Sequence, residues 1–194
     1  MRKILICLIF VVIFSLVQAP ASVAWTSVTH DDFVEEVYYF LPADAQQKLN
    51  LELMKSASDD PDFKFFDYRF HHYPASCARA DYWLDRGASA YEKGDYDQAS
   101  YSFGVASHYI TDSFCAPHCV DGATGYHSLY EIQATTLNPH ITIKSGNLDT
   151  LMADGHVKGQ YSWNSWMTSR DSSYIQADLN RAASACYVAI NNRI

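Results

Sequence analysis

Two histidine–carboxylate pairs with the same spacing constrain this chain more than any other feature. His108 and Asp112 are four residues apart, and His127 and Glu131 repeat that interval further along the chain. Positions i and i+4 lie on one face of an α-helix, so each pair can bind one metal ion if its segment is helical. The repeated pair therefore predicts two consecutive helices that carry metal ligands.

A third histidine lies between the two pairs. Pro117 is expected to end the first helix, because proline disrupts a helix interior, and this places His118 at the turn between the helices. A single His-x3-Asp pair is weak evidence for a metal site. Two such pairs joined by a turn histidine are much stronger evidence.

The rest of the chain predicts an all-α, single compact multi-helix domain. Its 194 residues suffice for one full core, and aromatic residues make up 14% of them. Apolar periodicity and capping signals predict helices over 31–41, 43–56, 75–93, 95–114, 127–137 and 172–191, with Asp95 as one N-cap. Residues 59–74 are expected to form a loop. Residues 138–171 have the weakest pattern and are expected to form a packed surface loop, with a short strand signal at 141–143.

The N-terminus has the pattern of a secretory signal peptide over residues 1–24. Arg2 and Lys3 precede an apolar run, and the Ser22-x-Ala24 pattern favours cleavage after Ala24. The run is short for a membrane span, which needs roughly 20 residues. We therefore expect a secreted protein, residues 25–194, with no transmembrane segment after cleavage. An uncleaved anchor is the alternative, and a monomer is the default expectation.

Charge is weak evidence about the substrate. Removal of Arg2 and Lys3 leaves 12 basic residues against 22 acidic ones, a net charge of −10. Such an acidic body is not typical of a polyanion-binding protein. Bound zinc ions would reverse that sign locally, however.

The mature chain would keep four cysteines: Cys77, Cys115, Cys119 and Cys186. Export makes disulfides the expected state, with three possible pairings. The alternative is that Cys115 and Cys119, which flank His118, are zinc thiolates. Disulfides are favoured, because the histidines and carboxylates already suffice for metal binding.

Further candidate ligands lie closer to the N-terminus. Trp25 would carry the free α-amine after cleavage, and an amine with a pKa near 7.7–8.0 can lose its proton to zinc at neutral pH. His30 follows five positions later, and the 59–74 segment offers Asp62 and His71.

Together these residues resemble the zinc-dependent phospholipase C family, which includes the bacterial phosphatidylcholine-preferring enzyme and the catalytic domain of clostridial alpha-toxin. The resemblance extends from Trp25 to Glu131 and is most specific in His108-x3-Asp112-x5-His118 followed by His127-x3-Glu131. It implies an all-helical domain with three zinc ions. The implied ligand sets are Trp25, His30 and Asp112; Asp62, His71, His108 and the bridging Asp112; and His118, His127 and Glu131.

The resemblance also implies an activity. A secreted phosphodiesterase of this kind would hydrolyse a phospholipid, at a membrane or micelle surface, to diacylglycerol and a phosphorylated head group through zinc-activated water. The family assigns a general-base role to the carboxylate at the Asp62 position, so Asp62 is also the candidate catalytic residue.

Three departures from the family pattern leave alternatives open. The Trp25-x4-His30 spacing is similar to that of the related fungal single-strand-specific zinc nucleases, although those enzymes have Asp where this chain has Glu131. Val28 occupies the position of the family's choline-recognising Glu. The short interval from Asp62 to His71 leaves His72 or Asp60 as possible replacements.

Three functions are therefore compatible with the sequence. They are a phospholipase C, a nuclease for single-stranded nucleic acid with the same three-zinc site, and a non-catalytic metal-binding domain. The lipid substrate is favoured, because few basic residues surround the motifs. His140 and His156 are expected to be core histidines without a ligand role, and Asp59, Asp60 and Asp67 could simply solvate a loop.

Overall fold

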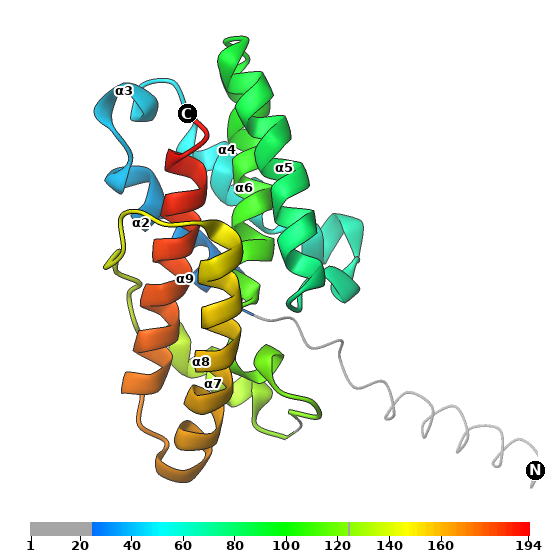
Figure 1. Ribbon diagram of the computed structural model, residues 1–194, viewed down its shortest axis with the longest axis vertical. Helices are drawn as coiled ribbons and strands as arrows, with labels where there is room; N and C mark the ends of the chain where they lie inside the picture. Colours follow the sequence, from blue (N-terminus) through cyan, green and yellow to red (C-terminus); the bar gives the residue numbers. More distant parts are fainter. Residues whose placement is uncertain (1–24, 124) are drawn as a thin grey trace, which may run out of the picture.

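The computed structural model describes residues 25–123 and 125–194, and this part of the chain is helical with no strand (Figure 1). The all-α prediction is confirmed. The predicted signal peptide lies outside the described residues. The elements in order are α2 Ser27–Phe40, α3 Ala43–Gln46, α4 Leu51–Ser58, η1 Pro61–Phe65, η2 Tyr68–Phe70, α5 Ala75–Glu92, α6 Tyr96–Asp112, η3 Ala116–Cys119, α7 His127–Ala134, α8 Leu148–Ser169 and α9 Ser173–Asn191.

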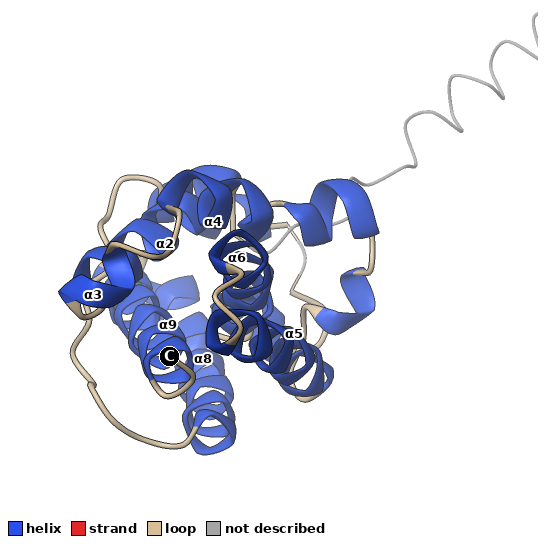
Figure 2. Cartoon of the chain, turned by 90° about the horizontal axis from the view of Figure 1, so that it is seen from above, coloured by secondary structure: helices blue, strands red, loops and turns tan. Residues whose placement is uncertain are grey.

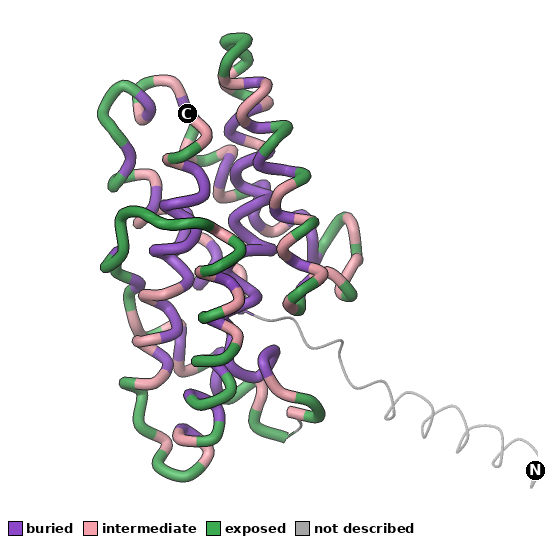
Figure 3. The backbone as a smooth tube through the Cα atoms, in the orientation of Figure 1, coloured by how far each residue is buried: buried purple, intermediate pink, exposed green. Residues whose placement is uncertain are grey.

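Helix α6 is the centre of the fold. It packs against α2, α4, α5 and α9, and every residue from Ser102 to Asp112 is buried. Figure 2 shows α6 among these helices, and Figure 3 shows buried residues (purple) concentrated in the interior of the helix bundle. A helix buried on all sides places its polar residues inside the core, where they need partners. The predicted metal ligands His108 and Asp112 are two such residues.

Gly104 allows α4 to approach α6 closely. A Cβ atom at this position would lie 2.2 Å from the carbonyl oxygen of Met54, a distance no real contact allows. The absence of a side chain thus brings the end of α4 beside α6. As a result, the carbonyl of Ser58 lies 2.7 Å from Nδ1 of His108.

Side-chain caps fix several helix starts. The predicted cap is present at Asp95, whose carboxylate accepts from the backbone N–H of Gln98. Thr26 starts α2 earlier than the sequence pattern indicated. The segment 43–56 was predicted as one helix and is in fact two, because Asn50 caps a new helix by accepting from the backbone N–H of Leu53.

The prediction of a surface loop over 138–171 is wrong for most of its length. Residues Leu148–Ser169 form α8, the longest helix of the described chain, which packs along α9 (Figure 1). Only 138–147 and the short connection at 170–171 lie outside helices, and the signal at 141–143 forms no strand in the described structure. Gly155 and Gly159 face Phe114 and Cys119, so this helix lies directly against η3. None of the helices in the described part combines the length and apolar character that crossing a bilayer requires.

Candidate metal centre

The first group of candidate ligands joins α2 to α6. His30, His108 and Asp112 are buried, and one ligand atom of each lies within 4.8 Å of the others. Nε2 of His30 is 3.3 Å from Oδ1 of Asp112, and Nε2 of His108 is 3.0 Å from Oδ2. The His30 and His108 rings stack with centroids 4.2 Å apart. These contacts place two imidazoles against a single buried carboxylate.

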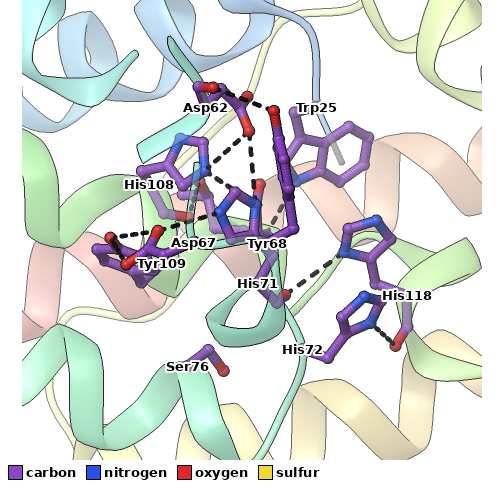
Figure 4. A network of polar contacts seen from close by, with 12 residues as sticks. Trp25, Asp62, Asp67, Tyr68, His71, His72, Ser76, His108, Tyr109 and His118 are labelled. Atoms are coloured by element: carbon purple, nitrogen blue, oxygen red, sulfur yellow. Dashed lines mark hydrogen bonds and ion pairs between the residues drawn. The ribbon is translucent and has the colours of Figure 1, made fainter. Parts of the chain in front are cut away.

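The second group joins α6 to the segment that covers it. Asp62 on η1 and His71 at the end of η2 meet His108, again with ligand atoms within 4.8 Å (Figure 4). Nδ1 of His71 is 2.9 Å from Oδ2 of Asp112 and 3.6 Å from Oδ1 of Asp62. Asp112 therefore contacts members of both groups, which is the geometry that a bridging carboxylate needs.

Outer contacts orient these ligands. The Nδ1–H of His108 donates to the carbonyl of Ser58, which directs Nε2 toward Asp112. Asp67 lies 3.7 Å from Nε2 of His71 and accepts from Tyr109 Oη at 2.9 Å. The guanidinium of Arg79 is 3.2 Å from the same carboxylate. Asp67 is thus part of the site's support, whereas the sequence offered loop solvation as its role.

Trp25 lies at the edge of the first group. Its side chain is fully buried, and its indole N–H donates to the carbonyl of Thr111 at 2.9 Å. Thr111 precedes Asp112, and its hydroxyl is 3.4 Å from Nδ1 of His30. The indole therefore anchors the backbone of residue 25 beside the predicted ligands.

The third group differs from the expected set. His127 and Glu131 contact each other at 2.7 Å between Nε2 and Oε1, and Cys115 completes a cluster within 4.8 Å. His118 is not one of these three residues, but its ring centroid is 5.0 Å from that of His127. Cys115 is thus an additional candidate ligand, in agreement with the thiolate alternative for this cysteine. Within the described residues no disulfide bond joins any of the cysteines.

The positions of His72 and Asp60 decide whether they could replace His71 and Asp62 as metal ligands. The exposed His72 stacks on His118 at 4.2 Å and belongs to none of the three groups. Asp60 is buried, but it is already satisfied by Lys64 at 2.8 Å and by the hydroxyl of Tyr101 at 2.8 Å. Asp62 is therefore better placed than Asp60 to bind a metal ion, and His71 is better placed than His72.

The two remaining histidines are not core residues. His140 is exposed. His156 is half-buried on α8, and its Nε2 is 3.3 Å from the amide nitrogen of Gln160. The expectation that both lie in the core is wrong, although neither belongs to a metal group of the described chain.

Burial and mutual contacts shift the pKa values of the ligands apart. Burial raises the pKa of Asp62 to about 6. Burial also opposes ionisation of Asp112, but contacts with His108 and His30 outweigh it and hold the pKa of this carboxyl well below its usual range. Burial lowers the pKa of His118 to about 3, so this imidazole is neutral and available as a ligand near neutral pH. Imidazole nitrogens and carboxylate oxygens are donors that zinc binds in proteins.

Buried ligand atoms without hydrogen-bond partners show that the residues fit zinc. They are His30 Nε2, Asp62 Oδ1, His71 Nε2, both carboxylate oxygens of Asp112, His118 Nε2 and Glu131 Oε1. Buried polar atoms normally have partners, because an unsatisfied one costs about 1–3 kcal/mol. Their concentration at one place indicates cations that complete the site.

Fold and site together define an all-α protein with a buried cluster of candidate metal ligands. The family model described as zinc dependent phospholipase C matches residues 29–178. The chain therefore belongs to the zinc-dependent phospholipase C family, and zinc dependence and hydrolase chemistry come with that membership. Neither the curated proteins nor the solved structures that were searched gave a match.

Proposed function

We propose that the protein is a secreted phospholipase C that hydrolyses phospholipids to diacylglycerol and a phosphorylated head group with three zinc ions. The observation that carries this proposal is the position of Asp112, whose carboxylate contacts His30 on one side and His71 and His108 on the other. A shared carboxylate between two ligand groups suits metal ions that act together on one phosphodiester. Family membership supports the lipid substrate.

The ligand sets of the proposal follow the three groups. Trp25 through its amine and carbonyl, with His30 and Asp112, would hold one ion. Asp62, His71 and His108 would hold a second, with Asp112 bridging. His118, His127 and Glu131 would hold the third, and Cys115 is close enough to take part. Bound zinc ions would offset the charge of the phosphodiester and make water a stronger nucleophile.

Asp62 is the proposed general base. Its Oδ1 is buried without a hydrogen-bond partner and lies 3.9 Å from Nε2 of His108. A carboxylate in this position is a chemically suitable acceptor for a proton from water. The hydroxyl of Tyr68 donates to the Asp62 carbonyl at 3.2 Å and fixes the backbone that presents this carboxylate.

A nuclease is the second candidate. The specific observation in its favour is the Trp25-x4-His30 spacing, together with the helical turn that places His30 directly against Asp112. Single-stranded nucleic acid would be its substrate. The same phosphodiester chemistry would serve both activities, so substrate assays must separate them.

The deciding experiment measures turnover of the chain beginning at Trp25 on phospholipid micelles and on single-stranded DNA, with and without a chelator. Zinc content is determined on the same samples. We expect chelator-sensitive release of phosphorylated head group and about three zinc ions per chain. Chelator-sensitive cleavage of DNA alone would assign the protein to the nuclease branch. Zinc binding without turnover of either substrate would favour a non-catalytic domain.

A further inference from the structure

A polar cavity lies beside the third metal group. Its volume is about 630 Å³, and it opens between α8 and the segment that follows η3. Its walls include His72, His118, Asp121, His156, Gln160 and Asn164. This volume falls in the range of about 300–1,000 Å³ that small-molecule sites occupy.

One wall of the cavity is a polar stripe on α8. His156, Gln160 and Asn164 follow each other at intervals of four residues, so they share one face of the helix. Nδ1 of His156 is buried without a hydrogen-bond partner. The neighbouring, buried face of α8 includes Gly155 and Gly159, which let the helix lie close to Phe114 and η3. The stripe thus presents hydrogen-bonding groups to the cavity that His118 also lines.

His118 connects the cavity to the metal centre. It lines the cavity and is only 5% exposed. Its Nε2 atom has no hydrogen-bond partner. Its ring is 5.0 Å from His127 on one side and 4.2 Å from His72 on the other. His118 is therefore shared between the cavity and the candidate third metal group.

The side chains that line the cavity favour some phospholipid head groups over others. The described residues that line the cavity include no lysine or arginine, so a second phosphate would find no cationic partner. Apart from the imidazoles, Tyr73 is the single aromatic side chain in this described lining, whereas a quaternary ammonium is best held by several aromatic faces. Imidazole and carboxamide groups instead suit hydroxyl groups, which both donate and accept, and the Asp121 carboxylate in the same wall can accept from a hydroxyl group.

We propose that this cavity binds the head group of the substrate and selects a neutral, hydroxylated one, of the glycerol or inositol kind, over choline. This inference rests on the proposed phospholipase C function. A site that hydrogen-bonds substrate hydroxyl groups discriminates strongly against an analogue that lacks them, because its own polar groups are then left unpaired. Gln160 and Asn164 are the specificity-determining side chains, and neither is a candidate metal ligand.

The test compares head groups in one micelle type. Turnover is measured on phosphatidylglycerol, phosphatidylinositol, phosphatidylcholine and phosphatidylethanolamine for the wild type and for the Gln160→Leu/Asn164→Leu double variant. We expect kcat/KM for the hydroxylated head groups to exceed that for phosphatidylcholine by about tenfold in the wild type, and this ratio to be lost in the variant. The larger kcat/KM of phosphatidylglycerol and phosphatidylinositol then identifies the preferred head group.

The matched control is Lys158→Leu. Lys158 lies on α8 between the stripe positions but is not part of the cavity lining, and it pairs only with Asp154 in the described structure. This control should keep the wild-type head-group ratio. If the double variant does not fold, the same head-group ratio is measured on the single variant Asn164→Ala. A wild-type preference for phosphatidylcholine or phosphatidylethanolamine, or an unchanged ratio in the folded variants, would overturn the inference.

A binding measurement separates this inference from the proposed function. Calorimetry of the zinc-loaded protein with glycerol phosphate and with phosphocholine reports on the cavity without turnover. Tighter binding of glycerol phosphate that depends on Gln160 and Asn164, in a protein that hydrolyses no phospholipid, would sustain the cavity assignment and reject the phospholipase. Hydrolysis of phospholipids with equal binding of the two phosphates would reject the cavity assignment alone.

Discussion

Asp112 and His108 lie one helical turn apart on α6, and Oδ2 of the carboxylate is 3.0 Å from Nε2 of the imidazole. Both side chains are fully buried. Burial of an ionised carboxylate is costly unless cations and hydrogen bonds compensate for its lost hydration. The buried Asp112 carboxylate at the centre of the fold therefore needs a cation to compensate for its lost hydration. Metal binding should for this reason contribute directly to the free energy of unfolding.

The first prediction concerns His108. The His108→Ala variant should lose zinc and about 3 kcal/mol of stability, on the order of 10 °C in Tm, because it leaves Asp112 without a main partner. The matched control is His140→Ala, since His140 is exposed and belongs to no metal group of the described chain. Zinc analysis and thermal unfolding measure both. Equal losses in the two variants would contradict the ligand role of His108.

The second prediction concerns the N-terminus. One extra residue before Trp25 should remove the α-amine ligand while every side chain stays in place. We expect the loss of one zinc ion and most of the activity, because the indole contact with Thr111 fixes the backbone of residue 25 beside His30 and Asp112. Zinc stoichiometry of the two forms tests this. Full zinc content in the extended protein would exclude Trp25 as a ligand.

Most of the helices could be predicted from the sequence, but α8 could not, for a physical reason. Its buried face consists of Met152, Gly155, Gly159, Ser162, Trp163 and Trp166. These positions have helical spacing, yet half of them are glycine or serine, so no apolar periodicity is visible. Small residues are buried here because η3 lies too close for larger ones.

The i,i+4 pairs correctly predicted that the candidate ligands of each pair share a helix, because both members belong to α6 or to α7. The contributions from loops were harder to predict. Cys115 joins His127 and Glu131 only through the turn at η3, and Asp67 reaches His71 only because η1 and η2 fold the 59–74 segment over α6. Spacing along the sequence does not encode such tertiary proximity. The one available signal was Asp67 four residues before His71 in a loop already rich in ligands.

The third prediction concerns Gly159. A Cβ atom there would lie 2.4 Å from Sγ and 3.0 Å from Cβ of Cys119, so we expect Gly159→Ala to displace the Cys119 side chain and push η3 away from α8. Overpacking of this kind costs about 1–3 kcal/mol. Because η3 carries His118, the variant should also lose zinc from the third site. Lys158→Ala is the neighbouring surface control, and an unchanged zinc content in Gly159→Ala would show that η3 tolerates the displacement.

The fourth prediction concerns Asp178, a buried carboxylate outside the metal centre. It accepts from the hydroxyls of Tyr130 and Ser162 and contacts Arg181. Burial nevertheless outweighs these contacts and raises its pKa from 3.8 to about 6. The folded state therefore keeps this proton at a pH where the unfolded chain has lost it, and the associated stability is lost as the pH rises through 6.

The comparison with Asp178→Asn isolates this effect, because asparagine stays neutral and leaves the metal ligands unchanged. Urea unfolding of both proteins from pH 4 to pH 7.5 should show the wild type losing stability relative to the variant, by about 3 kcal/mol at most. The decline should be centred between the unfolded and folded pKa values. Acid release of zinc affects both proteins alike and cancels in the difference. A difference that does not change with pH would mean that Arg181 and the two hydroxyls hold the Asp178 carboxylate ionised throughout.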